Sequence, residues 1–124
     1  MSYVGIVLIS HSPKIVEGTK DLIRQVIKEV PIEIAGGTDD GAIGTNVEMV
    51  QQAIERANDG EGVSVFYDIG SAKMNAEMAI EMIGEEDVKL MGAPLVEGSY
   101  VAAVESGMGK DVQRITAALA NEFG

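Results

Sequence analysis

Apolar and polar residues follow one another along this chain in blocks that predict strands and helices in turn. The first block, residues 4–9, is almost wholly apolar and ends abruptly at Ser10-His11-Ser12-Pro13. An apolar run without polar alternation is typical of a strand that is buried on both faces of a parallel sheet. A serine followed by a proline is a typical helix start, because proline has no N–H to leave unpaired there. His11, the only histidine of the chain, is therefore expected between the end of a strand and the start of a helix.

The rest of the chain repeats this order of strand and helix. Apolar positions at three- and four-residue steps predict that the first helix ends near Pro31. Thr45 followed by Glu48 predicts a capping box at the start of the second helix. The further strands are expected at 32–35, 63–68 and 88–93, and the further helices at 47–57, 70–83, 96–105 and 112–123.

This alternation predicts one α/β domain over residues 1–124, with an open, mainly parallel four-stranded sheet and helices on both faces. Right-handed crossovers leave few topologies, and the strand order 2-1-3-4 puts the reversal between the first and third strands. Ligands of open α/β sheets bind at such a switch point, outside the carboxyl ends of the strands. Asp68 ends the third strand as His11 ends the first, so we expect the two residues side by side.

Composition narrows the classes of function. The chain has no cysteine, which excludes disulfides and thiolate metal sites, and a single histidine argues against a zinc site. Its net charge of −11 argues against nucleic acids and anionic membranes as partners, and favours solubility or a basic protein partner. No apolar run is long enough to span a membrane and no signal-peptide pattern precedes the first strand, so we expect a cytoplasmic protein. No metal or cofactor is expected.

The polar residues at the predicted switch point allow more than one chemistry. An imidazole titrates near neutral pH and can act as a nucleophile, although a structural, hydrogen-bonded His11 is an equally ordinary interpretation. Asp68 can hold one ring N–H of the histidine, or it can simply cap a turn. The glycine-rich loop 36–44 can cradle a phosphoryl group with its amides, Gly37 included, and with the Thr38 hydroxyl, or it can be a plain turn. Whether Asp39 and Asp40 serve the site or only the turn stays open.

Three blocks of the sequence resemble the DhaM family, the phosphocarrier subunits of phosphoenolpyruvate-dependent dihydroxyacetone kinases. They are GIVLISHSP near the start, GGTDDG with IGT in the middle, and YDIGSA with MN later. The similarity extends over essentially the whole chain. It implies the fold of mannose-type enzyme IIA domains and a cytoplasmic phosphotransferase of glycerol metabolism.

The resemblance also implies roles for individual residues and partners. His11 would be the transient phosphohistidine, supported by Asp68. From the helix starts and the glycine-rich loop at this edge of the sheet, we ourselves expect Ser12, Gly37, Thr38 and Ser71 to bind the phosphoryl group. An HPr-type protein would supply the phosphoryl group, and a dihydroxyacetone kinase subunit with bound ADP would accept it.

Two departures from the family pattern bear on assembly. Mannose-type domains dimerise through an additional exchanged strand, and this sequence has no fifth strand-like run. We therefore expect any homodimer to use another surface, such as the methionine-rich helix. Some family members continue into donor-like domains, whereas this chain ends after one domain, so we expect a separate donor protein.

Two other functions compete with the phosphohistidine hypothesis. The first is a receiver-like domain phosphorylated on Asp68, but Ser10-His11 occupies the place of the acidic pair that a receiver needs. The second is a flavodoxin-like binding module, disfavoured because the chain has three tyrosines, two phenylalanines and no tryptophan to sandwich a flavin. The chemistry of the phosphoryl linkage separates the first two hypotheses, because a phosphohistidine survives alkali whereas an acyl phosphate does not.

Overall fold

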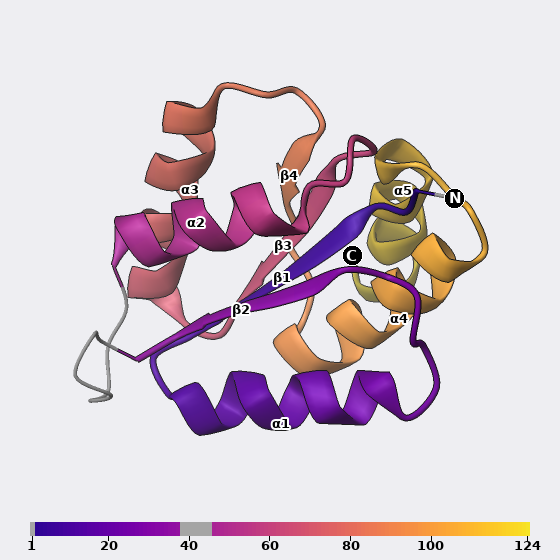
Figure 1. Cartoon of the computed structure of the whole chain (residues 1–124), viewed down its shortest axis with the longest axis horizontal. Helices are drawn as coiled ribbons and strands as arrows, with labels where there is room; N and C mark the ends of the chain where they lie inside the picture. The colour runs from indigo at the N-terminus through magenta and orange to yellow at the C-terminus, as the bar shows by residue number, and fades with distance from the viewer. Residues whose placement is uncertain (1, 38–45) are drawn as a thin grey trace.

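The computed structural model describes residues 2–37 and 46–124 and has four strands and five helices within them (Figure 1). The strands are β1 (Gly5–Ser10), β2 (Ile32–Gly36), β3 (Val63–Tyr67) and β4 (Val88–Leu90). The helices are α1 (Pro13–Arg24), α2 (Val47–Ala57), α3 (Gly70–Ile83), α4 (Leu95–Gly107) and α5 (Val112–Phe123).

The four strands form one parallel sheet in the order β2-β1-β3-β4, which confirms the predicted topology. All six residues of β1 are buried, because this central strand has a strand on each side and helices on both faces. Helices α1, α4 and α5 cover one face of the sheet, and α2 and α3 cover the other (Figure 1). Alternate β1 residues accordingly belong to two cores, with Ile6 and Leu8 in one and Val7 and Ile9 in the other.

The first helix is shorter than its apolar pattern predicts. It ends at Arg24, and the Arg24 guanidinium donates hydrogen bonds to the carbonyls of Ile27 and Val30 in the turn that follows. Val30 is fully buried, and Ile27 packs against the same core. The apolar spacing therefore continues beyond the helix because the turn also contributes side chains to the core.

Two other predicted boundaries were wrong. Asn46 caps α2 by accepting a hydrogen bond from the Met49 amide at 2.8 Å, so the N-cap is one residue after Thr45 and the predicted capping box with Glu48 is wrong. Thr45 itself lies outside the described residues. Strand β4 ends at Leu90 instead of residue 93, where Gly92 and Pro94 lead the chain away from the sheet toward α4.

No helix in the described part of the chain is long and apolar enough to cross a membrane.

Candidate functional site

The candidate site lies where β1 and β3 end side by side. Their register pairs Ile9 with Tyr67, so the residues that follow each strand emerge next to one another at the carboxyl edge of the sheet. These residues include His11 and Asp68, and their predicted juxtaposition is confirmed. The reversal of strand order falls between these two strands, as it does in the binding crevices of other open α/β sheets.

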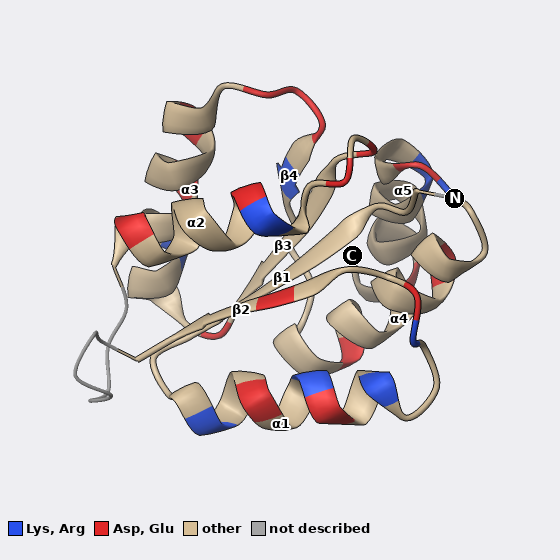
Figure 2. Ribbon diagram, in the orientation of Figure 1, with Lys and Arg blue, Asp and Glu red and all other residues tan. Residues whose placement is uncertain are grey.

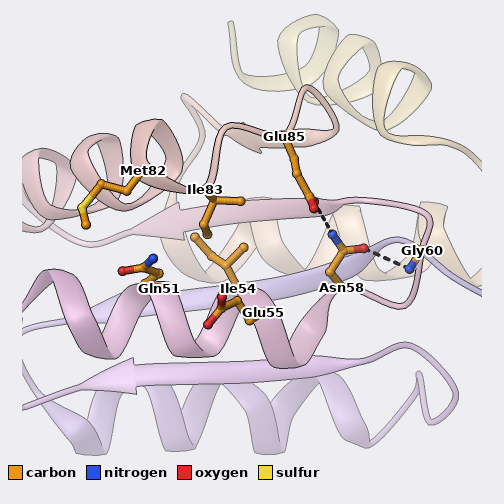
Figure 3. Close-up of a pocket in the computed structure, with 8 residues that line it drawn as sticks. All are labelled: Gln51, Ile54, Glu55, Asn58, Gly60, Met82, Ile83 and Glu85. Atoms are coloured by element: carbon orange, nitrogen blue, oxygen red, sulfur yellow. Dashed lines mark hydrogen bonds between the residues drawn. The ribbon is translucent and has the colours of Figure 1, made fainter.

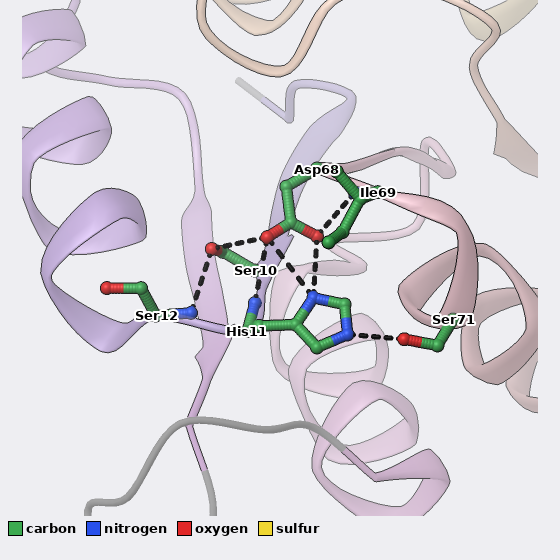
Figure 4. Close-up of polar contacts among 6 residues, drawn as sticks. All are labelled: Ser10, His11, Ser12, Asp68, Ile69 and Ser71. Atoms are coloured by element: carbon green, nitrogen blue, oxygen red, sulfur yellow. Dashed lines mark hydrogen bonds and ion pairs between the residues drawn. The ribbon is translucent and has the colours of Figure 1, made fainter.

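The imidazole of His11 faces the Asp68 carboxylate with one ring nitrogen (Figure 4). Its Nδ1 lies 3.1 Å from Oδ1 and 3.3 Å from Oδ2 of Asp68. The side chains of His11 and Asp68 are 21% and 15% exposed, so the pair is shielded from bulk water without being sealed from it. A partly exposed ring can meet a second protein while its contact with the carboxylate stays short.

Asp68 receives more donors than His11 alone. Its Oδ2 accepts hydrogen bonds from the Ser10 hydroxyl at 2.8 Å and from the His11 amide at 2.9 Å, and its Oδ1 accepts from the Ile69 amide at 2.6 Å. Burial by itself would raise the pKa of Asp68. The hydrogen bonds from the His11 and Ile69 amides, the Ser10 hydroxyl and the His11 ring outweigh that effect, so the pKa lies below its ordinary value. Asp68 is therefore ionised at neutral pH.

An ionised Asp68 fixes the protonation of the ring nitrogen that faces it. A carboxylate can only accept, so Nδ1 of His11 carries the hydrogen and donates it to Asp68. In the neutral imidazole the lone pair is then on Nε2, at the opposite side of the ring. Asp68 thus leaves the ring nitrogen that carries the lone pair directed away from the sheet.

The Nε2 atom meets the beginning of α3. It contacts the hydroxyl of Ser71, the second residue of this helix (Figure 4). The N-cap residue, Ile69, provides no side-chain cap. The Ala72 amide donates to the Ile69 carbonyl at 3.0 Å, whereas the amides of Gly70 and Ser71, the first two of the helix, have no carbonyl of an earlier turn to donate to. A Cβ added at Gly70 would meet nothing within 4 Å, so this turn of the chain is open. Unpaired amides and a helix dipole suit a phosphoryl group on Nε2.

The other residues that were predicted to bind the phosphoryl group are Ser12, Gly37 and Thr38. Ser12 is the N-cap of α1, as expected, with Pro13 as the first helical residue. Its amide donates to the Ser10 hydroxyl at 3.0 Å, while its own hydroxyl lies on the far side of Ser10 from the imidazole (Figure 4). Gly37 is buried with a φ of 78°, a left-handed conformation that favours glycine. Thr38 lies outside the described residues, as do Asp39 and Asp40.

Ser10 was missed by the sequence analysis. Its fully buried hydroxyl donates to Asp68 and accepts from the Ser12 amide, so it links the end of β1, the carboxylate and the start of α1. The available signal was a polar residue that closes an apolar run directly before the only histidine. A serine at the end of a strand is too common for that signal to identify a role.

A cavity of about 500 Å³ lies between α2 and α3, where Asn58 and Gly60 precede β3 (Figure 3). It is therefore near the amino ends of the strands, opposite His11. Within residues 2–37 and 46–124, no three histidine, aspartate or glutamate side chains cluster as metal ligands.

Comparison with known proteins gives consistent results. A family model described as the PTS system fructose IIA component (EIIA-man) matches residues 5–116. A phosphoryl donor subunit, DhaM, of PEP-dependent dihydroxyacetone kinase 1 from Listeria innocua is 44% identical over 115 residues, which cover 93% of this chain and 91% of the relative. The corresponding subunit from Escherichia coli is 40% identical over 119 residues, 90% of this chain but 25% of the relative. A solved structure of a protein of unknown function, EF1359, superposes with a TM-score of 0.86 at 35% identity, covering 97% of this chain and 94% of that one.

Proposed function

This chain belongs to the EIIA-man family, and from that membership we propose that it is a phosphocarrier that holds a phosphoryl group on Nε2 of His11. Its relatives bear the name of phosphoryl donor subunits of PEP-dependent dihydroxyacetone kinases, and we propose the same role here. The observation that carries the proposal is the contact between Nδ1 of His11 and the ionised Asp68, which leaves the Nε2 lone pair directed outward.

In the loading step, the Nε2 lone pair attacks the phosphorus of a phosphorylated, HPr-type donor protein. A new N–P bond forms at His11, the donor's bond to phosphorus breaks, and its electron pair stays on the donor. Because Nδ1 keeps its hydrogen, the phosphorylated ring carries a positive charge. The Asp68 carboxylate, 3.1 Å away, stabilises that charge as the buried aspartate of a serine-protease triad stabilises an imidazolium.

In the unloading step, a terminal phosphate oxygen of ADP on a kinase subunit attacks the same phosphorus. The P–N bond of His11 breaks, its electron pair returns to Nε2, and the ADP becomes ATP. Nδ1 stays protonated throughout, so neither transfer needs a proton relay within this chain.

Ser71 would change partner during this cycle. Its hydroxyl contacts Nε2 in the unloaded protein, and that nitrogen is occupied once phosphorylated. The hydroxyl can then donate to a phosphoryl oxygen, together with the Gly70 and Ser71 amides at the start of α3. Ser71 thus serves the phosphoryl group in this proposal, as the sequence predicts, whereas Ser12 contributes through the start of α1.

The direct test is incubation with phosphoenolpyruvate and the general phosphotransferase proteins, followed by intact mass. We expect the wild-type chain to gain one phosphate and a folded His11→Ala variant to gain none. The label should survive alkali and be lost in acid. A label that persists in His11→Ala, disappears in Asp68→Ala and is cleaved by hydroxylamine would instead establish the receiver-like function.

A further inference from the structure

The hydroxyl of Ser10 has only one consistent hydrogen-bond arrangement. Ser10 closes β1 and is fully buried. Its Oγ lies 2.8 Å from Oδ2 of Asp68 and 3.0 Å from the amide nitrogen of Ser12 (Figure 4). A carboxylate can only accept and an amide N–H can only donate, so the single hydrogen of the hydroxyl goes to Asp68. The hydroxyl is therefore a fixed donor to the carboxylate.

This donor holds the Asp68 oxygen that is farther from the imidazole. Oδ2 accepts from the Ser10 hydroxyl and from the His11 amide, and it lies 3.3 Å from Nδ1 of His11. Oδ1 accepts from the Ile69 amide and lies 3.1 Å from the same nitrogen. The terminal torsion of an aspartate is soft, so the plane of its carboxylate follows the donors around it. With Oδ2 held by the two donors at the end of β1, Oδ1 is the oxygen that is turned to the ring.

The burial of Ser10 makes its hydroxyl difficult to replace. Alternation along β1 puts Ser10 on the same sheet face as Ile6 and Leu8, whose side chains belong to the core under α1, α4 and α5. Removal of the hydroxyl takes one hydrogen-bond partner from Oδ2 of Asp68 and one from the Ser12 amide. Water does not reach Ser10, and leaving a buried polar group without its partner is costly. We therefore expect the carboxylate to change its orientation when this hydroxyl is absent.

We propose that Ser10 is a positioning residue for phosphoryl transfer, an inference that rests on the phosphocarrier function proposed above. Its hydroxyl holds the Asp68 carboxylate in the orientation that keeps the hydrogen of the His11 ring on Nδ1. The lone pair of the unloaded ring then stays on Nε2, and the N–H that faces Asp68 keeps its acceptor while the loaded ring is positively charged. Ser10 acts only through Asp68, because its hydroxyl has no second hydrogen to donate to a phosphoryl group.

The test compares Ser10→Ala with Ser106→Ala, which are a matched pair of variants. Each removes a fully buried serine hydroxyl that donates one hydrogen bond, and the hydroxyl of Ser106 donates to the Val4 carbonyl at 2.6 Å. Val4 directly precedes β1, whereas Ser10 is its last residue, so the Ser106 contact is at the end of this strand that is remote from His11. Ser106→Ala therefore measures the general effect of losing a buried hydroxyl.

Two quantities are measured on each protein. Nitrogen NMR at a pH where the ring is neutral gives the fraction of His11 that carries its hydrogen on Nδ1. Single-turnover phosphorylation by phosphoramidate, a small-molecule donor that needs no docking, gives the rate at which His11 is loaded. Ser106→Ala should match the wild type in both quantities. Ser10→Ala should show a mixture of the two tautomers and should load about three- to tenfold more slowly, which is the effect of one lost hydrogen bond.

Ser10→Thr is the rescue variant, because its hydroxyl can donate to Asp68 as that of serine does. It should return the tautomer and the loading rate to near the wild-type values. If Ser10→Ala does not fold, Ser10→Cys takes its place, since a thiol has a similar shape and is only a weak donor. Wild-type values in the folded alanine or cysteine variant would overturn the proposal, as would a folded Ser10→Thr that is no better than that variant.

A failure of the phosphocarrier function gives a different result. If the wild-type chain takes up no phosphoryl group, or if His11→Ala takes up as much as the wild type, the function itself fails and the positioning proposal falls with it. If the wild type is loaded on His11 while Ser10→Ala equals Ser106→Ala in tautomer and rate, only the positioning proposal is overturned.

Discussion

At the scale of single residues, the donors that converge on Asp68 determine how His11 presents its ring. Two amides, one hydroxyl and one ring N–H share its two oxygens, and the His11 amide and ring are both among them. The backbone and the side chain of the histidine are thus held by one carboxylate. The sequence predicted the pairing of His11 with Asp68, because both residues follow strand ends. It did not predict the role of Ser10, because the hydrogen bond from its hydroxyl to Asp68 depends on the three-dimensional positions of the two side chains.

Replacement of Asp68 by asparagine is the sharpest test of this arrangement. The variant keeps the shape but has only one acceptor oxygen, so the ring can adopt the tautomer with its hydrogen on Nε2. The equivalent change in a serine protease costs about 10⁴ in rate. We expect a smaller loss here, on the order of 10–10³, because positioning and the α3 amides are retained.

Single-turnover phosphorylation would measure the loss, and phosphorus NMR would identify the phosphorylated nitrogen. Asp87→Asn, which changes an exposed acid at the far edge of the sheet, is the control and should react like the wild type. A phosphate found on Nδ1 of the wild-type protein would contradict the role given to Asp68.

The lowered pKa of Asp68 also predicts a pH dependence of stability. Its pKa in the folded protein lies below the value of about 3.9 expected in the unfolded chain, so the unfolded chain binds the proton first as the pH falls. The stabilisation is therefore fully present above about pH 4–5 and is lost as the pH falls through the folded pKa. Urea unfolding from pH 7 to pH 3 should show a stability difference between wild type and Asp68→Asn that narrows below about pH 4. A stability difference between the two proteins that grows as the pH falls below about 4 would show that folding raises the pKa of Asp68 instead of lowering it.

At the scale of elements, β2 positions the start of α1 through a glycine. Gly36 pairs with Ser10 in the sheet, and a Cβ added to it would lie 2.6 Å from Val16 Cγ2 and 3.0 Å from Pro13 Cα. Only glycine lets the first turn of α1 sit this close to the end of β2. The sequence predicted both elements but not this contact, since a glycine at a strand end is equally typical of an ordinary turn.

Gly36→Ala should therefore disturb the site as well as the fold. The first turn of α1 must move, and we expect a loss of about 1–3 kcal/mol in the free energy of unfolding, with slower phosphorylation of His11. Gly18→Ala, in the same helix, has nothing within 4 Å of the added Cβ and should stabilise the protein by roughly 0.5–1 kcal/mol without changing the reaction. Urea unfolding and single-turnover phosphorylation would compare the two variants.

At the scale of the whole molecule, the sequence predicted the topology better than the distribution of charge. The alternation of apolar blocks leads directly to the order β2-β1-β3-β4, because right-handed crossovers leave few alternatives. The net charge of −11 favoured solubility or a basic protein partner and said nothing of where the acidic residues lie. In the folded chain Asp59, Glu61 and residues 85–87 gather away from His11, because they lie in loops at the other edge of the sheet (Figure 2). The net charge of a sequence does not show at which edge of the sheet the charged residues lie.

The complete burial of β1 also has a consequence for how the protein loses activity. His11 follows a six-residue strand that is hydrogen-bonded on both sides and covered on both faces. The amides of such a strand exchange with deuterium only through global opening, whereas chain ends and loops exchange through local fraying. His11, the proposed phosphoryl acceptor, is therefore attached to a strand whose six residues are all buried. On heating, the capacity to accept a phosphoryl group should disappear together with the last slowly exchanging amides, in one cooperative step.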